Sequence, residues 1–421
     1  MDFSFGPQDE AFRAEARDWL AAHLTGEFAA AVGRGGPGSE HEGVAARRAW
    51  ERELGAGGWI GIGWDDGEPS EYGNGGPGYG SEGPGHGGGG YSHRRAGLTQ
   101  QVVWAEEYAR VRAPGRVGHI GENLLAPTLI AHGDEAQRRR FLPGIARGEE
   151  LWCQGYSEPG AGSDLAGVRT AAVRERGTYR ISGQKIWTSL AQDADWCFVL
   201  ARTARGSRRH HGLSFLLVPM DQPGRIEVRP IRQMSGTSEF NEVFFDGATA
   251  RAEHVVGGEG NGWSVAMGLL ALERGVSTLV QQIGFAAELR SVLRTALDTG
   301  AAADPVLRDQ LVRQWAELRV MRWNALRTLG SSADRGAPSV AKLLWGGWHR
   351  RLGELAVRVR GAAATAGPYD WTEKRPYELD AEQWLFLFTR ADTIYGGSDE
   401  IQRTIIAERV LGLPREPKEA G

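Results

Sequence analysis

Two segments of the chain contain the residue types with the clearest chemical meaning. Residues 155–167 read GYSEPGAGSDLAG, and residues 183–189 read GQKIWTS. Glycines let backbone N–H groups approach a ligand closely, while hydroxyl and aromatic side chains supply hydrogen bonds and a stacking surface. The two segments together predict a cradle for a flat, hydrogen-bonding cofactor that carries phosphates.

The elements that must position this cradle follow from the spacing of apolar residues. Helical spacing occurs in residues 9–24, 102–112 and 135–147, and again, after an expected helix cap at Asn261, in residues 263–287, 305–329, 340–359 and 401–411. Short β-rich runs bounded by turn residues occur at 179–181, 196–201, 213–218, 226–230 and 243–245. This order predicts an α+β chain with an N-terminal helical domain (1–150), a central barrel-like or sandwich β domain (151–258) and a C-terminal helical bundle (259–421).

The composition is that of a folded chain with no strongly basic field. The 421 residues are 41% hydrophobic and carry a formal net charge of −4, which argues against a nucleic-acid or anionic-membrane partner. No apolar run approaches the roughly 18 residues that a membrane-spanning helix needs. The two cysteines, Cys153 and Cys197, lack metal-ligand spacing, so we expect no metal and a cytoplasmic location.

One stretch breaks the regular pattern. Residues 67–90 contain twelve glycines and three prolines. Such a composition offers too little apolar surface to offset the entropy lost on ordering. We expect an exposed loop inserted between helices, with a lid or a docking element for a partner as the alternative.

The paired segments resemble the flavin-binding signature of the acyl-CoA dehydrogenase family. Residues 231–245 (IRQMSGTSEFNEVFF) and the tail 394–409 are similar to two further signatures of that family. The resemblance covers nearly the whole chain except residues 67–90. It implies a C-terminal four-helix bundle and an FAD held between the β domain and the bundle, across a subunit interface.

The resemblance also implies roles for individual residues. Tyr156 and Ser157 would face the pyrimidine side of the flavin, Trp187 would pack on the ring system, and Ser189 would hydrogen-bond its reactive edge. The full set of expected cofactor-binding residues is Gln154, Gly155, Tyr156, Ser157, Trp187, Thr188, Ser189, Ser398, Asp399 and Glu400. The expected substrate-binding residues are Ser163, which would touch the thioester arm, and Arg274, Gly396 and Gly397.

The implied reaction is the α,β-dehydrogenation of an acyl thioester. A carboxylate removes the α-proton and the β-hydrogen leaves as hydride to FAD, while a ribityl hydroxyl and a backbone N–H, here that of Gly396, polarise the thioester carbonyl. Many members carry the base in the tail signature, where this chain has Gly396. Isovaleryl- and long-chain-type members carry it in a Leu-x-Leu-Glu-Arg pattern, which residues 270–274 match, so the resemblance makes Glu273 the base. Asp392, Asp399 and Glu400 are the fallback candidates.

Three classes of function stay open from the sequence. The first is a dehydrogenase that acts on acyl-CoA or on an acyl carrier protein thioester in lipid metabolism and passes electrons to an electron-transfer flavoprotein. The second is a flavin monooxygenase or oxidase on the same fold, and the third is a non-catalytic subunit of a heteromeric dehydrogenase, suggested by the altered segment 361–368 (GAAATAGP). We expect a homodimer or homotetramer, with a heteromer as the alternative.

Overall fold

The structure is a computed structural model, which describes residues 5–36, 39–40, 42–64, 94–272, 277–328, 336–366 and 379–415. The Gly-rich stretch 67–90, Glu273 and Arg274 lie outside these residues. The chain divides into two compact units. We call Phe5–Arg232 with Ser238–Glu273 the sheet unit, and Arg274–Gly421 with Gln233–Thr237 and Met1–Ser4 the bundle unit.

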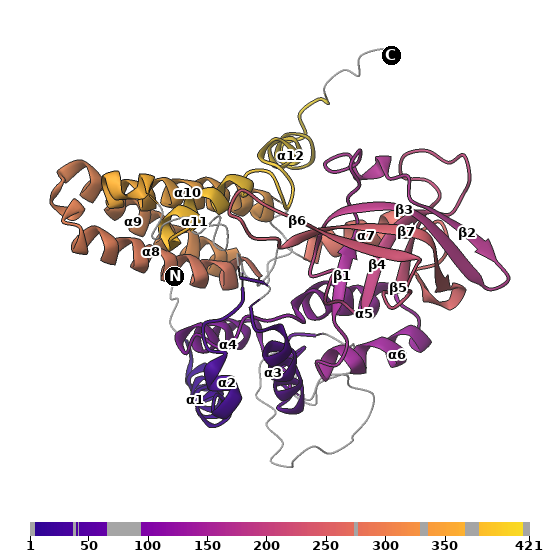
Figure 1. Cartoon of the computed structure of the whole chain (residues 1–421), viewed down its shortest axis with the longest axis horizontal. Coiled ribbons are helices and arrows are strands. Elements are labelled where there is room, and N and C mark those ends of the chain that lie inside the picture. The colour runs from indigo at the N-terminus through magenta and orange to yellow at the C-terminus, as the bar shows by residue number, and fades with distance from the viewer. Residues whose placement is uncertain are drawn as a thin grey trace. The chain divides into compact units, whose positions relative to one another are not determined.

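The sheet unit begins with helices, as the periodicity predicts (Figure 1). They are α1 (Pro7–His23), α2 (Gly26–Ala30), α3 (Val44–Ala56), α4 (Leu98–Arg110), a π-helical turn at Gly121–Leu125, α5 (Ala126–His132) and α6 (Glu135–Ala146). Helix α6 starts with a capping box, in which the Asp134 carboxylate accepts from Gln137 N. The predicted helices at 9–24, 102–112 and 135–147 are confirmed as α1, α4 and α6.

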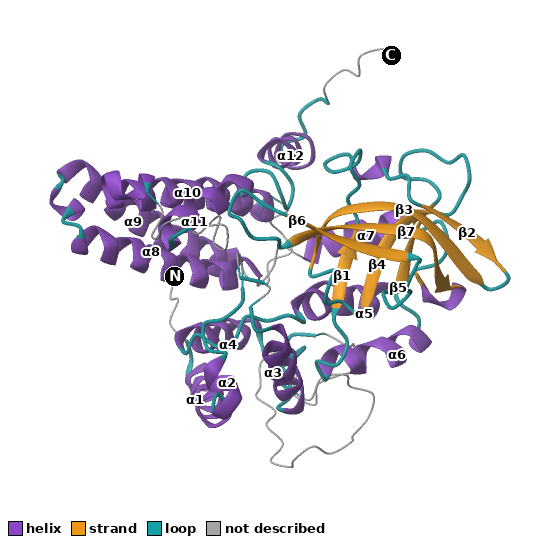
Figure 2. Cartoon of the chain, viewed as in Figure 1, coloured by secondary structure: helices purple, strands orange, loops and turns teal. Residues whose placement is uncertain are grey.

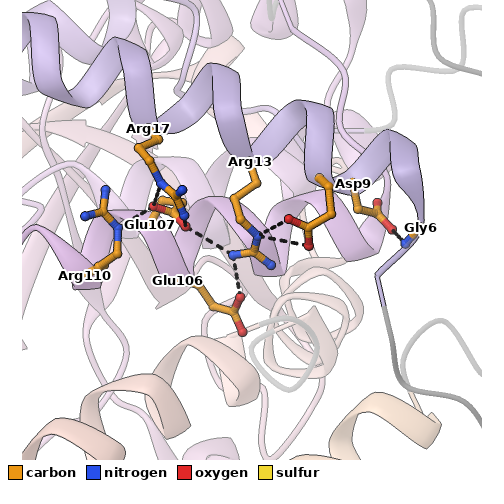
Figure 3. Close-up of polar contacts among 8 residues, drawn as sticks. Gly6, Asp9, Arg13, Arg17, Glu106, Glu107 and Arg110 are labelled. Atoms are coloured by element: carbon orange, nitrogen blue, oxygen red, sulfur yellow. Dashed lines mark hydrogen bonds and ion pairs between the residues drawn. The ribbon is translucent and has the colours of Figure 1, made fainter.

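A network of charged side chains joins α1 to α4 (Figure 3). Glu107 on α4 is buried and accepts hydrogen bonds from Arg13, Arg17 and Arg110, at 3.3, 2.9 and 2.6 Å. Burial by itself would raise the pKa of the Glu107 carboxyl, but the three guanidinium groups outweigh it and lower the pKa to about 2. The network therefore holds the two helices together through a carboxylate that is ionised at neutral pH.

The sheet contains every β-rich run expected from the sequence, and Figure 2 shows its strands in orange. Three strands were not expected, β1, β2 and β8. The strands are β1 (Trp152–Gly155), β2 (Ala171–Glu175), β3 (Thr178–Ser189), β4 (Trp196–Arg202), β5 (Leu213–Pro219), β6 (Ile226–Ile231), β7 (Phe240–Arg251) and β8 (Val255–Val256). Their order is β6-β7-β3-β2-β4-β5-β8, with β1 parallel to β4.

Alternate residues of β4 and β5 enter two separate cores. Phe198 and Phe215 pack with α5, α6 and α7 (Gly262–Leu272) in one core. Val199 and Leu216, on the opposite face, pack against residues of β3 and β7, such as Ile181. Strands of the same sheet thus pack against one another across the second core, which describes a curved mixed sheet with β6 and β8 at the two ends of its strand order.

The bundle unit is built from α8 (Ser277–Asp298), α9 (Pro305–Thr328), α10 (Ala337–Arg360) and α11 (Ala381–Phe388), which pack around one core. Helix α12 (Asp399–Ile405) and a π-helical turn at Ile406–Val410 follow the tail signature. The predicted helices at 305–329 and 340–359 are thus confirmed. Among the helices of the described ranges, none combines the length and the apolar character needed to cross a membrane.

Candidate active site

The first half of the predicted cradle is the end of β1 and the turn that follows it. Gly155 ends β1, and a Cβ at this position would lie 2.9 Å from Cys197 Sγ, so the close packing of β1 on β4 requires glycine here. Gln154 is half-buried and Tyr156 is buried. Glu158 N and O pair with Ala161 O and N at 3.1 and 2.9 Å, which closes the turn, and Ser163 beyond it is exposed.

The second half of the cradle is shaped by a β-bulge in β3. Lys185 pairs with Val243 and Thr188 with Asn241, so Ile186 and Trp187 together oppose the single residue Glu242. Trp187 adopts φ = +61°, which is strained for a bulky residue. The extra residue reverses the alternation of buried and exposed positions along β3. Lys185 and Thr188 are both fully buried, whereas Trp187 is 55% exposed. The bulge therefore presents the indole to solvent near the end of β3.

The side chains brought together here fit a flavin. The exposed indole of Trp187, edge-on to Phe240 at 6.0 Å, offers a flat apolar face. Within the described part of the chain, the Ser157 and Ser189 hydroxyls make no hydrogen bond, and the buried Thr188 Oγ1 has no partner. Hydroxyls that the protein itself does not use can serve the polar edge of a bound isoalloxazine ring. Which of these residues contact the cofactor stays a prediction.

Two charged residues within these segments, Glu158 and Lys185, have no role in the sequence-based prediction, yet the structure buries both. The signal was available in the period-two pattern, since Lys185 continues the alternate positions of the buried Tyr179 and Ile181. A lysine at such a position is rarely buried unless it is paired. Burial lowers the pKa of Lys185, and the facing Glu158 carboxylate partly opposes this.

The tail signature lies in the bundle unit as a short loop before α12. Gly396 and Gly397 have φ of +64° and +84°, a conformation that favours glycine. The buried Gln402 amide donates to their carbonyl oxygens at 3.4 and 3.2 Å. Ser398 caps α12 by accepting from Ile401 N, while Asp399 and Glu400 lie in the first turn. Gln402 is a further residue that the sequence-based prediction missed, because its partners lie in an irregular loop.

A buried ionic cluster supports the start of this loop. The His349 ring on α10 bonds Asp392 Oδ2 at 2.7 Å and Glu288 Oε2 at 2.6 Å. Burial alone would lower the pKa of His349, but its two carboxylate partners raise it to about 9. Tyr395 donates to Asp392 Oδ1 at 2.6 Å, and the Lys342 ammonium donates to the Asp392 carbonyl. Both carboxylate oxygens of Asp392 are thus in use.

The predicted base, Glu273, lies outside the described residues, as does Arg274. The helix that precedes it, α7, ends at Leu272 and buries Val265, Ala266 and Leu269 in the core beneath the sheet. The assignment of Glu273 as base and of Arg274 as a substrate-binding residue therefore stays a prediction.

The chain is similar to known proteins over almost its entire length. Family models for the N-terminal, middle and C-terminal domains of acyl-CoA dehydrogenase match residues 6–149, 153–248 and 260–411. Acyl-CoA dehydrogenase IpdE1 of Mycobacterium tuberculosis is 54% identical over 411 residues, which cover 97% of this chain and 99% of that protein. The IpdE1 protein of Mycolicibacterium smegmatis is 52% identical and covers 97% of this chain and 98% of its own.

Solved structures give the same result. The Tcur3481-Tcur3483 steroid ACAD has a TM-score of 0.77 at 27% identity, covering 99% of this chain and 100% of that chain. The ChsE4-ChsE5 complex from Mycobacterium tuberculosis has a TM-score of 0.76 at 29% identity, with coverage of 99% and 100%.

The domain order, the cradle and these similarities agree. The chain belongs to the acyl-CoA dehydrogenase family. It is accordingly an FAD-dependent oxidoreductase that acts on CH–CH groups of acyl-CoA.

Proposed function

We propose that this chain dehydrogenates a bulky, ring-bearing acyl-CoA at its α and β carbons to give the 2-enoyl-CoA. The observation that carries the proposal is the bulge that exposes Trp187 beside Ser189, together with family membership. FAD, when bound, accepts the β-hydrogen as hydride. The residues proposed to hold FAD in the sheet unit are Gln154, Gly155, Tyr156, Ser157, Trp187, Thr188 and Ser189, and those in the bundle unit are Ser398, Asp399 and Glu400.

In this proposal Glu273 removes the α-proton, and the backbone N–H of Gly396 polarises the thioester carbonyl. Two fallback bases suit the task poorly. Asp392 has both oxygens engaged by His349 and Tyr395. Glu400 is exposed, and hydrogen bonds from its own backbone and from Ser398 lower its pKa, which weakens it as a proton acceptor at neutral pH.

Substrate size is inferred from the tail loop and from the relatives. A Cβ at Gly396 would meet Lys342 Cε at 3.6 Å, which is ordinary contact, so this exposed position has space above the backbone. Structures of a steroid ACAD resemble this chain at 26–27% identity. We therefore expect a ring-bearing acyl group bound through its thioester arm by Ser163, Arg274 and Gly397.

A homologous second subunit is proposed as the structural partner, because two of the similar structures contain paired chains, Tcur3481-Tcur3483 and ChsE4-ChsE5. Helix α9 offers a face for it. Val312, Trp315, Val320 and Trp323 are each about half exposed, and helical geometry places Val312, Val320 and Trp323 opposite the buried Leu311, Leu318 and Met321, with Trp315 at the border of the buried face. We expect native mass spectrometry to give a heteromer when the chain is produced with such a subunit. An electron-transfer flavoprotein is proposed as electron acceptor.

The proposal is tested by anaerobic bleaching of the bound flavin. Ring-bearing acyl-CoA should bleach the wild type faster than isovaleryl-CoA, butyryl-CoA or acyl carrier protein thioesters. Glu273→Gln should keep its yellow colour and lose at least about 10³-fold in reduction rate, the usual scale for a general base. Glu135→Gln, at an exposed position of α6, serves as the matched control and should still bleach. A Glu273→Gln enzyme that bleaches normally would refute the assignment of the base.

Two measurements separate the alternatives. Oxygen consumption coupled to substrate turnover would indicate a monooxygenase or an oxidase in place of a dehydrogenase. An FAD content far below one per chain in the protein purified alone would indicate that the cofactor site needs the second subunit, as the altered segment 361–368 suggests.

A further inference from the structure

The Lys185 side chain joins the two halves of the cradle. It is fully buried, and its three ammonium protons match three acceptors: Tyr156 O at 2.9 Å, Glu158 Oε1 at 2.9 Å and Leu200 O at 2.8 Å. Lys185 itself is the last paired residue of β3 before the bulge that exposes Trp187. One ammonium group therefore binds the loop after β1 to the strand that carries the other half of the cradle.

Glu158 extends this connection to the far end of the same loop. Its Oε1 also accepts from Thr170 N at 2.8 Å, and its Oε2 accepts from Arg169 N at 2.6 Å. The loop from Tyr156 to Thr170 is thus closed at both ends by a single buried ion pair, 2.9 Å between Lys185 Nζ and Glu158 Oε1. The Ile186 N–H adds a bond to Ser157 O at 3.0 Å.

A buried ion pair is a poor choice for stability alone. Removing two charges from water costs free energy that their attraction often fails to recover, and well-packed apolar residues of similar size are frequently as stable or more stable. A pair whose hydrogen bonds go to the backbone of one ligand-binding loop has a different effect, because it fixes where that backbone lies. Lys185 and Glu158 form such a pair, because they bond backbone groups at both ends of the loop 156–170.

We propose that Lys185 and Glu158 are positioning residues for FAD: their buried pair sets the register between the loop 156–170 and the bulge at Ile186–Trp187. This inference rests on the flavin cradle proposed above. Neither side chain need touch the cofactor. Its consequence is that the pair contributes to FAD retention beyond its contribution to the stability of the fold.

The test compares FAD release from purified holoenzymes, followed by the rise in flavin fluorescence after dilution, with thermal unfolding of the same samples. Lys185→Met/Glu158→Leu removes both charges and the partners of Arg169 N, Thr170 N, Tyr156 O and Leu200 O, so it should unfold at a somewhat lower temperature. It should release FAD at least about tenfold faster than a control variant with a similar loss of unfolding temperature, the change that 1.4 kcal/mol produces. Glu158→Gln keeps the side-chain size and places an amide against Arg169 N. Glu158→Gln should also release FAD faster than the wild type. The proposal therefore remains testable with this variant if the double variant fails to fold.

Gln222→Met is the matched structural control. The Gln222 amide donates to Pro219 O and Thr249 O at 2.8 and 2.9 Å and accepts from Thr249 N at 2.7 Å, away from the cradle, since Thr249 pairs with Arg180. This variant should unfold at a lower temperature and release FAD at the wild-type rate.

Trp187→Gly distinguishes a failure of the positioning role of Lys185 and Glu158 from a failure of the flavin cradle itself. If it loses FAD while Glu158→Gln and the double variant hold FAD as the wild type does, the positioning role is wrong and the cradle stands. If Trp187→Gly also retains FAD normally, the proposed cradle itself is wrong. Faster FAD release that only parallels a lower unfolding temperature, as a purely structural role predicts, would likewise overturn the inference.

Discussion

His349 is predicted to stabilise the bundle unit as a buried cation, and His349→Gln tests this. The ring bridges Asp392 on one side and Glu288 on the other, whereas a glutamine amide carries no charge and can satisfy only one of them well. Neither carboxylate would then face the His349 cation, and Asp392 is the fully buried one of the two. Breaking such a pair usually costs about 3–5 kcal/mol.

The sign of the pH dependence follows from the raised pKa. A pKa of about 9 in the folded chain against 6.5 in the unfolded chain means that the stabilisation is complete below pH 6.5 and is lost as pH rises through 9. The difference between these two values corresponds to roughly 3 kcal/mol, an upper limit for this buried pair. The difference in unfolding free energy between wild type and His349→Gln should therefore be largest at pH 6 and narrow by up to about 3 kcal/mol at pH 9.5.

The assay is urea unfolding, followed by tryptophan fluorescence, because Trp345 and Trp348 lie in the same core as the cluster. Asp392→Asn should flatten the pH profile in the same way. His211→Gln, at an exposed position of the sheet unit, should change neither stability nor profile. A wild-type-to-variant difference that stays constant from pH 6 to 9.5 would show that His349 is neutral in the fold and would refute the argument.

Two further predictions concern the sheet unit. Glu107→Gln should leave α1 and α4 less firmly joined, by about 1–2 kcal/mol at pH 7, since Arg17 and Arg110 are half exposed and solvent screens them. With its pKa lowered to about 2, the Glu107 carboxylate stabilises the fold above pH 4.5 and loses this effect as pH falls through 2. The unfolding free energy of the variant should therefore depend less steeply on pH in this window than that of the wild type. Identical acid-unfolding profiles of the two proteins would contradict the network in Figure 3. Gly183→Ala should lower stability by about 2 kcal/mol, because at φ = +154° its Cβ would lie 2.7 Å from Thr170 Cα, a backbone atom that cannot move aside. Gly160→Ala, whose Cβ meets nothing within 4 Å, should be nearly neutral in the same thermal scan, and equal losses at both positions would argue against the close approach.

The cradle shows which features of the site can be predicted from the sequence and which cannot. The structure brings segments 155–157 and 183–189 together, since Ile186 N donates to Ser157 O and Lys185 donates to Tyr156 O, while the cofactor contacts of these residues stay a prediction. The direction of each side chain was not predictable. A single extra residue at the bulge exchanges the buried and exposed positions after Lys185, and bulges are set by the pairing with β7, which local patterns do not contain.

The α–β–α order of the elements and family membership depend on local spacing and on short motifs, and the sequence by itself determined both, although it did not reveal strands β1, β2 and β8. The α–β–α order follows from whether apolar residues recur with a period of 3.6 or 2, a property of ten or fifteen neighbouring residues. The pairing of Lys185 with Glu158 and the pairing of His349 with Asp392 and Glu288 were decided by tertiary structure alone. The partners of His349 lie 43 and 61 positions away along the chain, and only packing of α10 between α8 and the tail removes water from these charges and makes their pairing necessary.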